Sequence, residues 1–462
     1  MNALLINPWI TDFAAYDFWD KPLGLLYIGA FLERAGWTVR LIDCMDRHQP
    51  GGGRDIAGKA GSFGTGKFPN TVIEKPACIA HVPRQFRRYG IPVELFEKRL
   101  REVPHPDVVL VTGLMTYWYP GVFEAIRRVR EHLPGVPVVH GGIYATLCAD
   151  HARNESGADV VVDSGDPALI LATIDEVTSH KDDNNDLPIS FSEWPEPLWH
   201  LYESLPALSV MTTRGCPLSC TVCASRRLFD GFERRDPVKA AEDIIALANR
   251  GADDIAFADD ALLLDPETHA MPLFARLADT GAPVRLHTPN GLHVRAITPE
   301  LASLMKRAGV ETIRLSLETS SDDRAADFSR KVSREDFRRA AGALYGAGFT
   351  VHNLGAYILA GLPGQTPGEM LNTAAFSLEC GIPVKPALFS PVPGTVMFER
   401  AVAAGMIRHG DDPLLHNNTL RTVDWWPDSE RGYNAFRYRV SAANAALVRG
   451  EQTGRIIDSL FN

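Results

Sequence analysis

Short apolar runs, each followed by a segment of mixed polar and apolar residues, recur along this chain of 462 residues. In the first part of the chain these runs are rich in β-branched residues and carry few charges. They are Met1–Ile6, Thr38–Asp43, Asp107–Thr112, Val136–His140 and Asp159–Asp163. Runs of this kind are typical of strands that are buried on both faces of a parallel sheet. The pattern predicts a doubly wound α/β sheet whose ligand lies over the carboxyl ends of the strands.

A helix is predicted between the first two of these strands. Pro22 stands near its start and Gly36 follows its end, the positions that these residues favour at helix boundaries. Apolar residues between them recur at helical spacing, namely Leu23, Leu26, Tyr27, Ala30 and Phe31. The helix therefore has one apolar face with which it can cover the sheet.

A second series of strand-like runs begins near Ser209 and alternates with amphipathic stretches such as Pro299–Ala308. The later runs are Asp254–Asp260, Val284–Thr288, Thr312–Glu318, His352–Leu359 and Pro386–Ser390. Regular alternation of strands and helices predicts a parallel barrel. Six units fit an open, partial (β/α)6 barrel better than a closed one with eight strands.

These patterns divide the chain into four parts. We expect a first domain over residues 1–170, a linker over 171–204, the partial barrel over 205–398 and a C-terminal extension over 399–462. The polar stretch Ser179–Pro188 is typical of an interdomain linker, and Trp194 and Trp199 after it are expected to brace the two domains. The extension contains Trp425-Trp426 and a helical tail, and we expect it to cap the barrel or to contact the substrate.

Composition excludes some function classes. The net charge of −10 argues against a broad nucleic-acid surface, because phosphate binding requires clustered Lys and Arg. No apolar run is long enough to span a membrane. Seven cysteines, an odd number, and a start without a basic, apolar leader are typical of a reducing compartment, and we expect a cytoplasmic protein.

Three of the cysteines lie within eight residues, as Cys216-Pro-Leu-Ser-Cys220-Thr-Val-Cys223. A C-x3-C-x2-C run supplies three thiolates from one loop, one fewer than a cubane iron–sulfur cluster takes, so one iron would keep an open position. A partial zinc site and a disulfide are the alternatives. Zinc usually takes a further Cys or His at short spacing, and disulfides are rare in reducing compartments.

With its flanks, Ser209-Val-Met-Thr-Thr-Arg-Gly-Cys-Pro217, the motif places the cysteines on a loop after a strand, and here the chain resembles the radical S-adenosylmethionine (SAM) superfamily. The resemblance implies that Cys216, Cys220 and Cys223 bind a [4Fe–4S] cluster and that SAM chelates the open iron. It also implies reductive cleavage of SAM to a 5′-deoxyadenosyl radical. Such an enzyme acts on a small-molecule or peptide substrate and takes electrons from a donor such as flavodoxin or ferredoxin.

Polar residues at the ends of the barrel strands are the candidate SAM contacts. By the resemblance, Asp259 and Asp260 would bind the amino group, although the family often has a Gly-Gly-Glu-like segment there. Ser316 and Glu318 would contact the ribose or the amino group. The remaining candidates are Gly361 and Pro363 of the Gly361–Gly364 turn near the adenine, and Arg235, whose guanidinium can hold a carboxylate through two hydrogen bonds. The alternative for each residue is an ordinary strand end or surface charge.

Small residues also follow the strands of the first domain. No G-x-G-x-x-G follows the first strand, which disfavours a dinucleotide. The arrangement resembles the cobalamin-binding domain that precedes the barrel in one class of radical SAM proteins, and the alternative is a similar fold that binds no corrin. The candidate cobalamin contacts are Asn7, Pro8, Thr112, Gly113, Leu114, Thr116, Gly141, Gly142, Ile143, Tyr144 and Gly165.

Two further motifs in this domain are weak. Asp46-Arg-His48-Gln-Pro-Gly51 matches the D-x-H-x-x-G signature of cobalt-ligating histidines, but it follows the second strand instead of the first, so we expect His48 at the rim of the pocket. Gly61–Lys67 resembles a phosphate-binding loop, yet Phe68-Pro69 prevents the helix that the loop needs. We interpret it as a flexible glycine-rich insertion that could form a lid with Gly51–Gly53.

Together these features predict a radical SAM enzyme that uses cobalamin to transfer a methyl group to an unactivated carbon. A rearrangement or cyclisation without methylation is the alternative within the same enzyme class. A non-catalytic sensor that binds a corrin or a cluster is the alternative outside it.

Overall fold

A computed structural model of the chain describes residues 1–49, 58–179, 190–329, 331–420 and 430–461. The chain folds into two compact units. Unit 1 contains Met1–Ser209, Arg227–Asp230 and Asp411–His416. Unit 2 contains Val210–Arg226, Gly231–Gly410 and Asn417–Asn462. The C-terminal part of the chain thus contributes a short segment to unit 1 as well as helices to unit 2.

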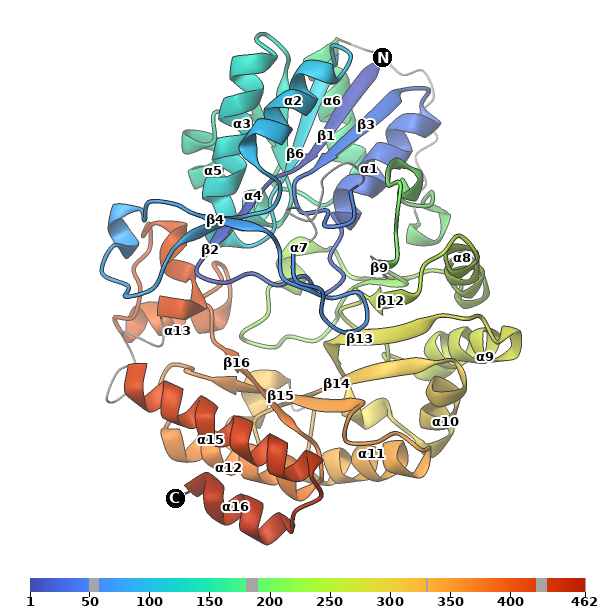
Figure 1. Cartoon of the computed structure of the whole chain (residues 1–462), viewed down its shortest axis with the longest axis vertical. Helices are drawn as coiled ribbons and strands as arrows, with labels where there is room; N and C mark the ends of the chain where they lie inside the picture. The colour runs from blue at the N-terminus through green and yellow to red at the C-terminus, as the bar shows by residue number, and fades with distance from the viewer. Residues whose placement is uncertain (50–57, 180–189, 330, 421–429, 462) are drawn as a thin grey trace. The chain divides into compact units, whose positions relative to one another are not determined.

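The centre of unit 1 is a five-stranded sheet in the order β3-β1-β6-β7-β8, and every neighbouring pair is parallel (Figure 1). Its strands are β1 (Asn2–Asn7), β3 (Thr38–Asp43), β6 (Val108–Thr112), β7 (Val138–Gly141) and β8 (Val160–Val161). The strand order reverses beside β1, because β3 lies on one side of it and β6 on the other. This confirms the predicted doubly wound sheet and all five of its strands.

Helices cover both faces of this sheet because its strands alternate apolar side chains to the two sides. Leu4 and Ile6 pack in one core cluster with Phe96 of α2 and Val122 of α3. Leu5 points the other way, toward Gly29 of α1. The helices of unit 1 are α1 (Leu23–Arg34), α2 (Val93–Glu102), α3 (Tyr119–His132), α4 (Ile143–Leu147), α5 (Ala149–Glu155) and α6 (Pro167–Thr178).

A small antiparallel sheet of β2 (Ile10–Asp12), β5 (Arg87–Tyr89) and β4 (Asn70–Val72) extends unit 1. Next to it, Gly61–Lys67 forms a bonded turn in which the Gly61 amide donates to the Thr65 carbonyl at 2.8 Å. Trp19 Nε1 donates to the carbonyl of Phe63 in the same turn. The prediction of a flexible insertion is therefore wrong for this segment, because neighbouring polar groups satisfy its backbone. Gly51–Gly53 lie outside the described residues.

The segment before unit 2 packs on α1. Trp194 contacts the rings of Tyr27 and Phe31 edge-on, and Trp199 is buried. The predicted linker boundary at residue 171 lies inside α6, whereas most of Ser179–Pro188 lies outside the described residues. The tryptophans that were expected to brace two domains have their described contacts within unit 1.

The second sheet has six strands in the sequential order β16-β15-β14-β13-β12-β9, and all of them but β9, which spans the boundary at Ser209, belong wholly to unit 2. The strands are β9 (Ala207–Val210), β12 (Asp254–Phe257), β13 (Arg285–Leu292), β14 (Val310–Glu318), β15 (Leu354–Ala360) and β16 (Val384–Leu388). The pairs from β12 to β16 are parallel. This sheet contains the six predicted strands, and its first and last strands are edges, as in a partial barrel.

Helices cover one face of this sheet (Figure 1). They are α8 (Pro237–Asn249), α9 (Ala270–Thr280), α10 (Pro299–Arg307), α11 (Arg334–Gly346) and α12 (Pro367–Glu379). Phe257 of β12 meets Phe274 of α9 edge-on on that side. The opposite face carries polar side chains such as Asp254 and His287, which bond to each other at 2.9 Å.

The chain ends in α13 (Val396–Ala403), α15 (Glu430–Val448) and α16 (Thr453–Phe461). Asn444 of α15 accepts a hydrogen bond from the Val384 amide and donates one to its carbonyl, both at 2.8 Å. The side chain thus acts as a strand partner for β16 and protects an edge of the sheet. The described part of this tail is helical, as expected, and Trp425-Trp426 lie outside the described residues.

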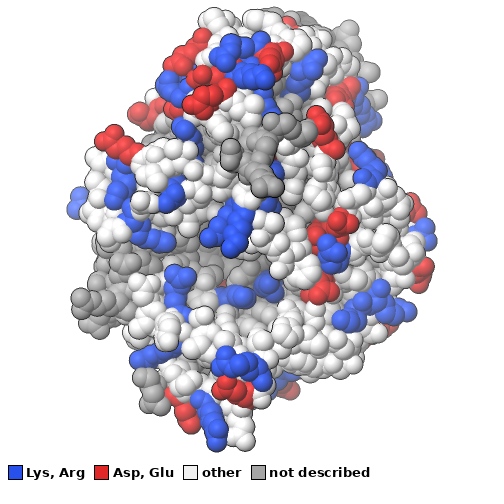
Figure 2. All heavy atoms as spheres, viewed as in Figure 1, with Lys and Arg blue, Asp and Glu red and all other residues white. Residues whose placement is uncertain are grey.

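In the part of the chain that the structure describes, no helix combines the length and the apolar character needed to cross a membrane. Basic and acidic side chains are interspersed on the face that Figure 2 shows. Some of them pair along a helix, as Arg127 does with Glu124 at 3.0 Å.

Candidate functional site

The three clustered cysteines lie in the connection between the two strands of a small antiparallel pair, and not directly after the first strand of the sheet. β9 ends at Val210, and β10 (Thr213–Gly215) then pairs antiparallel with β11 (Phe232–Arg234). Cys216 follows Gly215, whose φ of 76° suits glycine. Between the other two cysteines, the Cys223 amide donates to the Cys220 carbonyl at 3.1 Å in a tight turn. We call Cys216–Cys223 the cysteine loop.

The thiols of this loop do not form a one-metal site. Among the described residues, no group of three or more Cys, His, Asp or Glu converges on a single metal ion. A cubane cluster requires a different arrangement, because each thiolate binds a different iron. Burial raises the pKa of Cys216, and the Asp260 carboxylate adds to the rise. Metal binding would therefore have to displace protons from the loop.

Asp259 holds the chain that enters the cysteine loop. Its carboxylate accepts hydrogen bonds from the Thr212 amide at 3.1 Å, the Thr212 hydroxyl at 2.7 Å and the Thr213 amide at 2.5 Å. The residue is buried, and desolvation raises its pKa to about 6 despite these donors. The structure thus directs the enclosed Asp259 carboxylate to the chain that enters the cysteine loop, and a direct contact of Asp259 with SAM stays a prediction.

Asp260 holds the other end of the same loop. Its Oδ2 accepts a hydrogen bond from the Ser225 hydroxyl at 2.6 Å, and the Ser225 amide contacts Cys223 Sγ at 3.4 Å. Asp260 itself is exposed. Consecutive carboxylates after β12 thus support the chain before Cys216 and the chain after Cys223, and only the second has an oxygen available for a ligand.

The middle of the loop is bonded to the segment that follows β14. The amide and hydroxyl of Thr221 donate to the Asp327 carbonyl at 2.8 and 3.1 Å. The Ser329 hydroxyl accepts from the Ser219 amide at 3.0 Å and lies 3.7 Å from Cys220 Sγ. These contacts join residues more than one hundred positions apart in the sequence.

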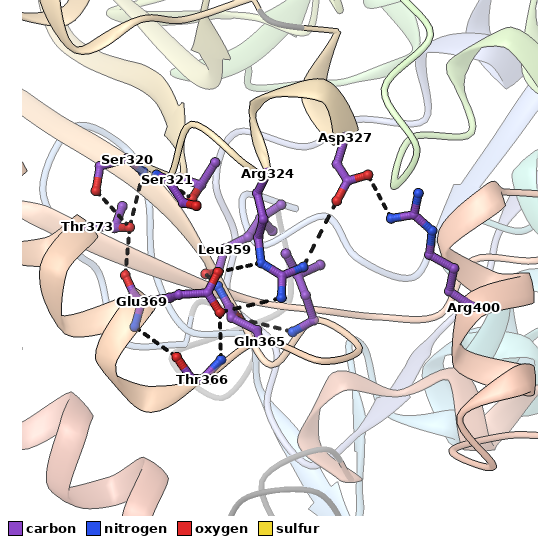
Figure 3. Close-up of polar contacts among 12 residues, drawn as sticks. Ser320, Ser321, Arg324, Asp327, Leu359, Gln365, Thr366, Glu369, Thr373 and Arg400 are labelled. Atoms are coloured by element: carbon purple, nitrogen blue, oxygen red, sulfur yellow. Dashed lines mark hydrogen bonds and ion pairs between the residues drawn. The ribbon is translucent and has the colours of Figure 1, made fainter.

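The segment after β14 that contains Asp327 also connects to the Gly361–Gly364 turn after β15, through the polar network in Figure 3. Asp327 pairs with Arg400 at 2.7 Å and lies 4.0 Å from Arg324. Arg324 pairs with Glu369 at 2.7 Å, and Glu369 accepts from the Thr366 amide at 2.8 Å to cap α12. Contacts of side chains therefore run from the cysteine loop to the start of α12.

Gln365, next to that cap, fixes the turn that contains Gly361 and Pro363. Its side chain accepts from the Leu362 amide at 3.1 Å and donates to the Leu359 carbonyl at 3.0 Å. Gly361 has a φ of 82°, in the region that favours glycine. The structure thus places the turn expected near the adenine at the end of a bonded network that starts at the cysteines.

Ser316 and Glu318 occupy different environments at the end of β14. Glu318 bonds to Lys331 at 3.0 Å. Burial alone would lower the pKa of Lys331, but Glu318 and the Cys220 thiol raise it. Ser316 is buried, and a Cβ on Gly291 would lie 2.2 Å from its hydroxyl. Glu318 therefore belongs to the surroundings of the cysteines, whereas Gly291 covers Ser316.

Arg235 has a carboxylate partner within the protein. Its guanidinium is buried and pairs with Asp243 of α8 at 3.1 Å. Its amide donates to the Thr212 carbonyl at 2.9 Å. A protein carboxylate thus pairs with Arg235 in this structure, and a contact of Arg235 with the SAM carboxylate stays a prediction.

In unit 1, the ends of β6 and β7 form a surface shaped by backbone. Gly142 has a φ of 94°, and a Cβ there would lie 2.7 Å from the Gly113 carbonyl and from Thr112 Oγ1. Leu114 and Met115, just beyond the end of β6, are each 42% exposed. We call Thr112–Met115 with Gly141–Ile143 the β6–β7 edge. It offers apolar surface and backbone groups to a ligand.

Other candidates of this domain contribute to packing. Thr116 is buried and bonds to His416 at 3.0 Å, and Tyr144 is buried and bonds to His151 at 2.6 Å. Both side chains are enclosed by protein in this structure, and their contacts with cobalamin stay predictions. Asn7 donates to Asp43 at 2.7 Å and Pro8 is buried, whereas Gly165 is exposed after β8.

His48 lies after β3, at the loop expected to form the rim. Its amide donates to Asp46 Oδ1 at 3.1 Å. Burial lowers the pKa of its ring, and the nearby Lys21 and Arg47 lower it further. Gly51 of the same motif lies outside the described residues.

No sequence signal distinguished the contacts that hold the cysteine loop. Asp327, Ser329 and Lys331 stand in a polar segment without a motif, and Thr212 is one of several threonines before the cysteines. The consecutive carboxylates stand at a predicted strand end, but the direction of each side chain depends on the fold.

Comparison with known proteins gives two family matches. Residues 210–377 match the radical SAM superfamily, and residues 84–171 match the B12-binding domain. The first range contains the cysteine loop, the glycine turn and most of the six-stranded sheet. The second contains the β6–β7 edge.

Several known proteins are similar over most of the chain. An uncharacterized methyltransferase of Pyrococcus horikoshii is 23% identical over 69% of this chain and 72% of its own length. Cytidylyl-2-hydroxyethylphosphonate methyltransferase of Streptomyces wedmorensis is 21% identical over 88% of this chain and 82% of its own. Among solved structures, the radical SAM methyltransferase TsrM of Kitasatospora setae has a TM-score of 0.64 at 15% identity, covering 92% of this chain and 86% of TsrM. This last similarity concerns the fold.

Proposed function

Because the chain belongs to the radical SAM superfamily and carries a B12-binding domain, we propose that it is a cobalamin-dependent methyltransferase that methylates an unactivated carbon. The observation that carries the proposal is the cysteine loop, supported at both ends and in the middle by unit 2 and preceded in the chain by a B12-binding domain. The methyltransferases that align with most of the chain favour methyl transfer over other outcomes.

The thiols of Cys216, Cys220 and Cys223 would bind a [4Fe–4S] cluster. The contacts from Asp259, Asp260 and Asp327 hold the loop in place, so its shape does not depend on the metal alone. When bound, the cluster, SAM and cobalamin supply one-electron cleavage and methyl transfer, which protein side chains cannot perform.

Other residues would position the cofactors. The Lys331 ammonium supplies positive charge beside the thiolates, and Glu318 holds it there. The Gly361–Gly364 turn would receive the adenine. In unit 1, the exposed Leu114 and Met115 would lie against a corrin, and the backbone packing at Gly142 keeps that edge flat. An external electron donor and a small-molecule or peptide substrate complete the reaction.

The test is anaerobic purification with cobalamin, reconstitution with iron and sulfide, and assay of SAM products after reduction. We expect a cluster and a corrin absorption spectrum, and formation of 5′-deoxyadenosine. Cys220→Ala should abolish SAM cleavage and leave cobalamin binding unchanged, whereas Cys380→Ala, at the end of α12, should retain both.

Two outcomes would contradict the proposal. SAM cleavage without bound corrin would overturn cobalamin-dependent methylation and favour a rearrangement or cyclisation. Bound corrin without any SAM cleavage would favour a sensor.

A further inference from the structure

Two basic side chains, Arg314 of β14 and Lys385 of β16, flank the same glycine of the strand between them. Arg314 is paired in register with Gly355, and Lys385 is paired with Tyr357. A Cβ on Gly355 would lie 3.3 Å from Lys385 Cγ and 3.4 Å from Arg314 Cδ. Both stems therefore pack against the bare backbone of Gly355.

These side chains lie on the face of the sheet that the helices do not cover. Side chains alternate along a strand, and the buried neighbours Ile313 and Leu315 point to the helix side. Arg314 therefore points to the opposite face. Gly355 and Lys385 share that face through the register. This is also the face that carries His287 and Asp254.

In the described part of the chain, no carboxylate oxygen lies within 4.0 Å of a side-chain nitrogen of Arg314 or Lys385. Arg314 Nη1 donates to the carbonyl of the preceding Ile313 at 3.1 Å. Other basic groups of unit 2 are paired, as Arg285 is with Asp254 at 2.7 Å and Lys331 is with Glu318. Arg314 and Lys385 differ from them in having no carboxylate.

Holding two cations together without an anion is unfavourable. Burial lowers the pKa of Arg314. Partial desolvation of the ammonium and the charge of Arg314 lower the pKa of Lys385, although the residue as a whole is exposed. Tyr357 does not relieve the repulsion, because its hydroxyl donates to the Pro289 carbonyl at 2.9 Å. An anionic group that bound both side chains would supply the missing charge.

We propose that Arg314 and Lys385 bind the anionic group of the substrate, a carboxylate, phosphate or phosphonate. The guanidinium can hold two oxygens of such a group in a fork, and the ammonium can bind as a point charge. That the anion belongs to the substrate rests on the proposed function. The presence of an anion site rests on the two side chains alone.

The carboxylate of SAM is a different candidate for the same chemistry, and its expected position disfavours it. Lys331 and Glu318 mark the end of β14 that lies beside the cysteines. Arg314 precedes Glu318 by four residues, which is about 13 Å along a strand. A SAM carboxylate that chelates the cluster would not reach Arg314 from there.

The test uses the reconstituted protein and titrates inorganic phosphate, acetate and SAM separately by calorimetry. We expect Arg314→Gln and Lys385→Gln to weaken binding of phosphate or acetate about ten-fold or more, and to leave SAM affinity and 5′-deoxyadenosine formation within about two-fold of wild type. Arg276→Gln, which removes an exposed partner of Glu242 on the helix side, is the matched control and should change nothing.

The remaining outcomes separate the two proposals. The anion site would be overturned if all variants bound phosphate and acetate as tightly as wild type, or if the variants lost affinity for SAM alone. Loss of anion binding in a protein that never cleaves SAM would support the anion site and contradict the proposed function. If Arg314→Gln does not fold, Lys385→Met tests the same pair, because Lys385 is exposed. Arg314→Lys keeps the positive charge and should therefore retain part of the wild-type anion affinity.

Discussion

The cysteine loop and the β6–β7 edge are both candidate cofactor surfaces, yet they are built in opposite ways. Polar groups from distant parts of the chain hold the cysteine loop, among them the carboxylates of Asp259 and Asp260 and the backbone carbonyl of Asp327. Backbone geometry shapes the β6–β7 edge, where Gly142 has no space for a side chain. Polar bonding dominates the first, and steric fit dominates the second.

This difference follows from what each surface would hold. Thiolates must be kept at defined positions around a small, charged cluster, so the loop needs many directional contacts. A corrin is large and flat, so its contact surface needs an absence of protruding atoms more than it needs particular side chains. We therefore expect the most damaging substitutions at the cysteine loop to be those that remove a buried polar group. At the β6–β7 edge, we expect them to be those that add side-chain volume.

The largest effect should come from Asp259, and it should depend on pH. Its pKa is about 6 in the folded protein, against 3.8 as the ordinary value. The folded state therefore binds this proton more tightly, so the stabilisation is complete below pH 4 and is lost as pH rises through 6. Protonation of Asp259 contributes up to about 3 kcal/mol to the free energy of unfolding.

Unfolding of the metal-free protein between pH 4 and pH 7 measures this effect. Asp259→Asn should remove the part of the pH dependence of the unfolding free energy that comes from this carboxyl group. The difference in unfolding free energy between wild type and variant should therefore change between pH 4 and pH 7. Asp265→Asn is the control, since Asp265 pairs with Arg234 on the surface. A difference that stays constant with pH would contradict the buried-carboxylate assignment.

A smaller effect is expected at the β6–β7 edge. Gly142→Ala should weaken cobalamin binding about ten-fold, because the new Cβ would collide with backbone atoms of Gly113 and displace the edge. Gly135→Ala is a matched control, because Gly135 also has a positive φ, of 82°, but has open space around it.

Gly135→Ala should lose about 1 kcal/mol of stability from the unfavourable φ. Gly142→Ala should lose more, because its backbone, with φ 94° and ψ −175°, lies in a region that almost only glycine adopts and its Cβ would collide with Gly113. Titration with hydroxocobalamin and equilibrium unfolding separate the two effects. Equal cobalamin affinity in the two variants would show that the shape of this edge does not govern binding.

The smallest effects should come from the arginines that contact Asp327. The Arg324 and Glu369 side chains are 15% and 26% exposed, whereas Arg400 is 48% exposed. Arg324→Gln should therefore cost about 1 kcal/mol, and Arg400→Gln less than about 0.5 kcal/mol, because solvent screens the second pair. Urea denaturation measures both. A larger loss for Arg400→Gln would mean that the network in Figure 3 is anchored at α13 instead of α12.

Much of the fold could be predicted from the sequence. The five apolar runs of the first domain and the six of the second all became strands of their sheets, because apolar periodicity reports burial directly. Local signals were also sufficient for α1, where Pro22 and Gly36 mark the ends. The run near Ser209 also became a strand of its sheet, β9, but it is followed by a separate strand, β10, that the sequence did not indicate.

The side chains of the candidate site were harder to predict. Asp259 and Arg235 have the right chemistry for SAM, but one faces Thr212 and the other faces Asp243. Thr116 and Tyr144 have the right place along their strands but are enclosed. In each case residue type and strand position were known, and the direction of the side chain was not.

The sequence by itself determined the two parallel sheets, their order in the chain and the spacing of three cysteines, because periodicity and short motifs are local properties. Only the tertiary structure decided which polar groups are available to a ligand. The contacts that decide this join positions far apart in the chain, such as Thr221 with Asp327 and Arg314 with Lys385 across Gly355. A buried polar group takes whichever partner the fold brings near it, and a linear pattern does not specify that partner.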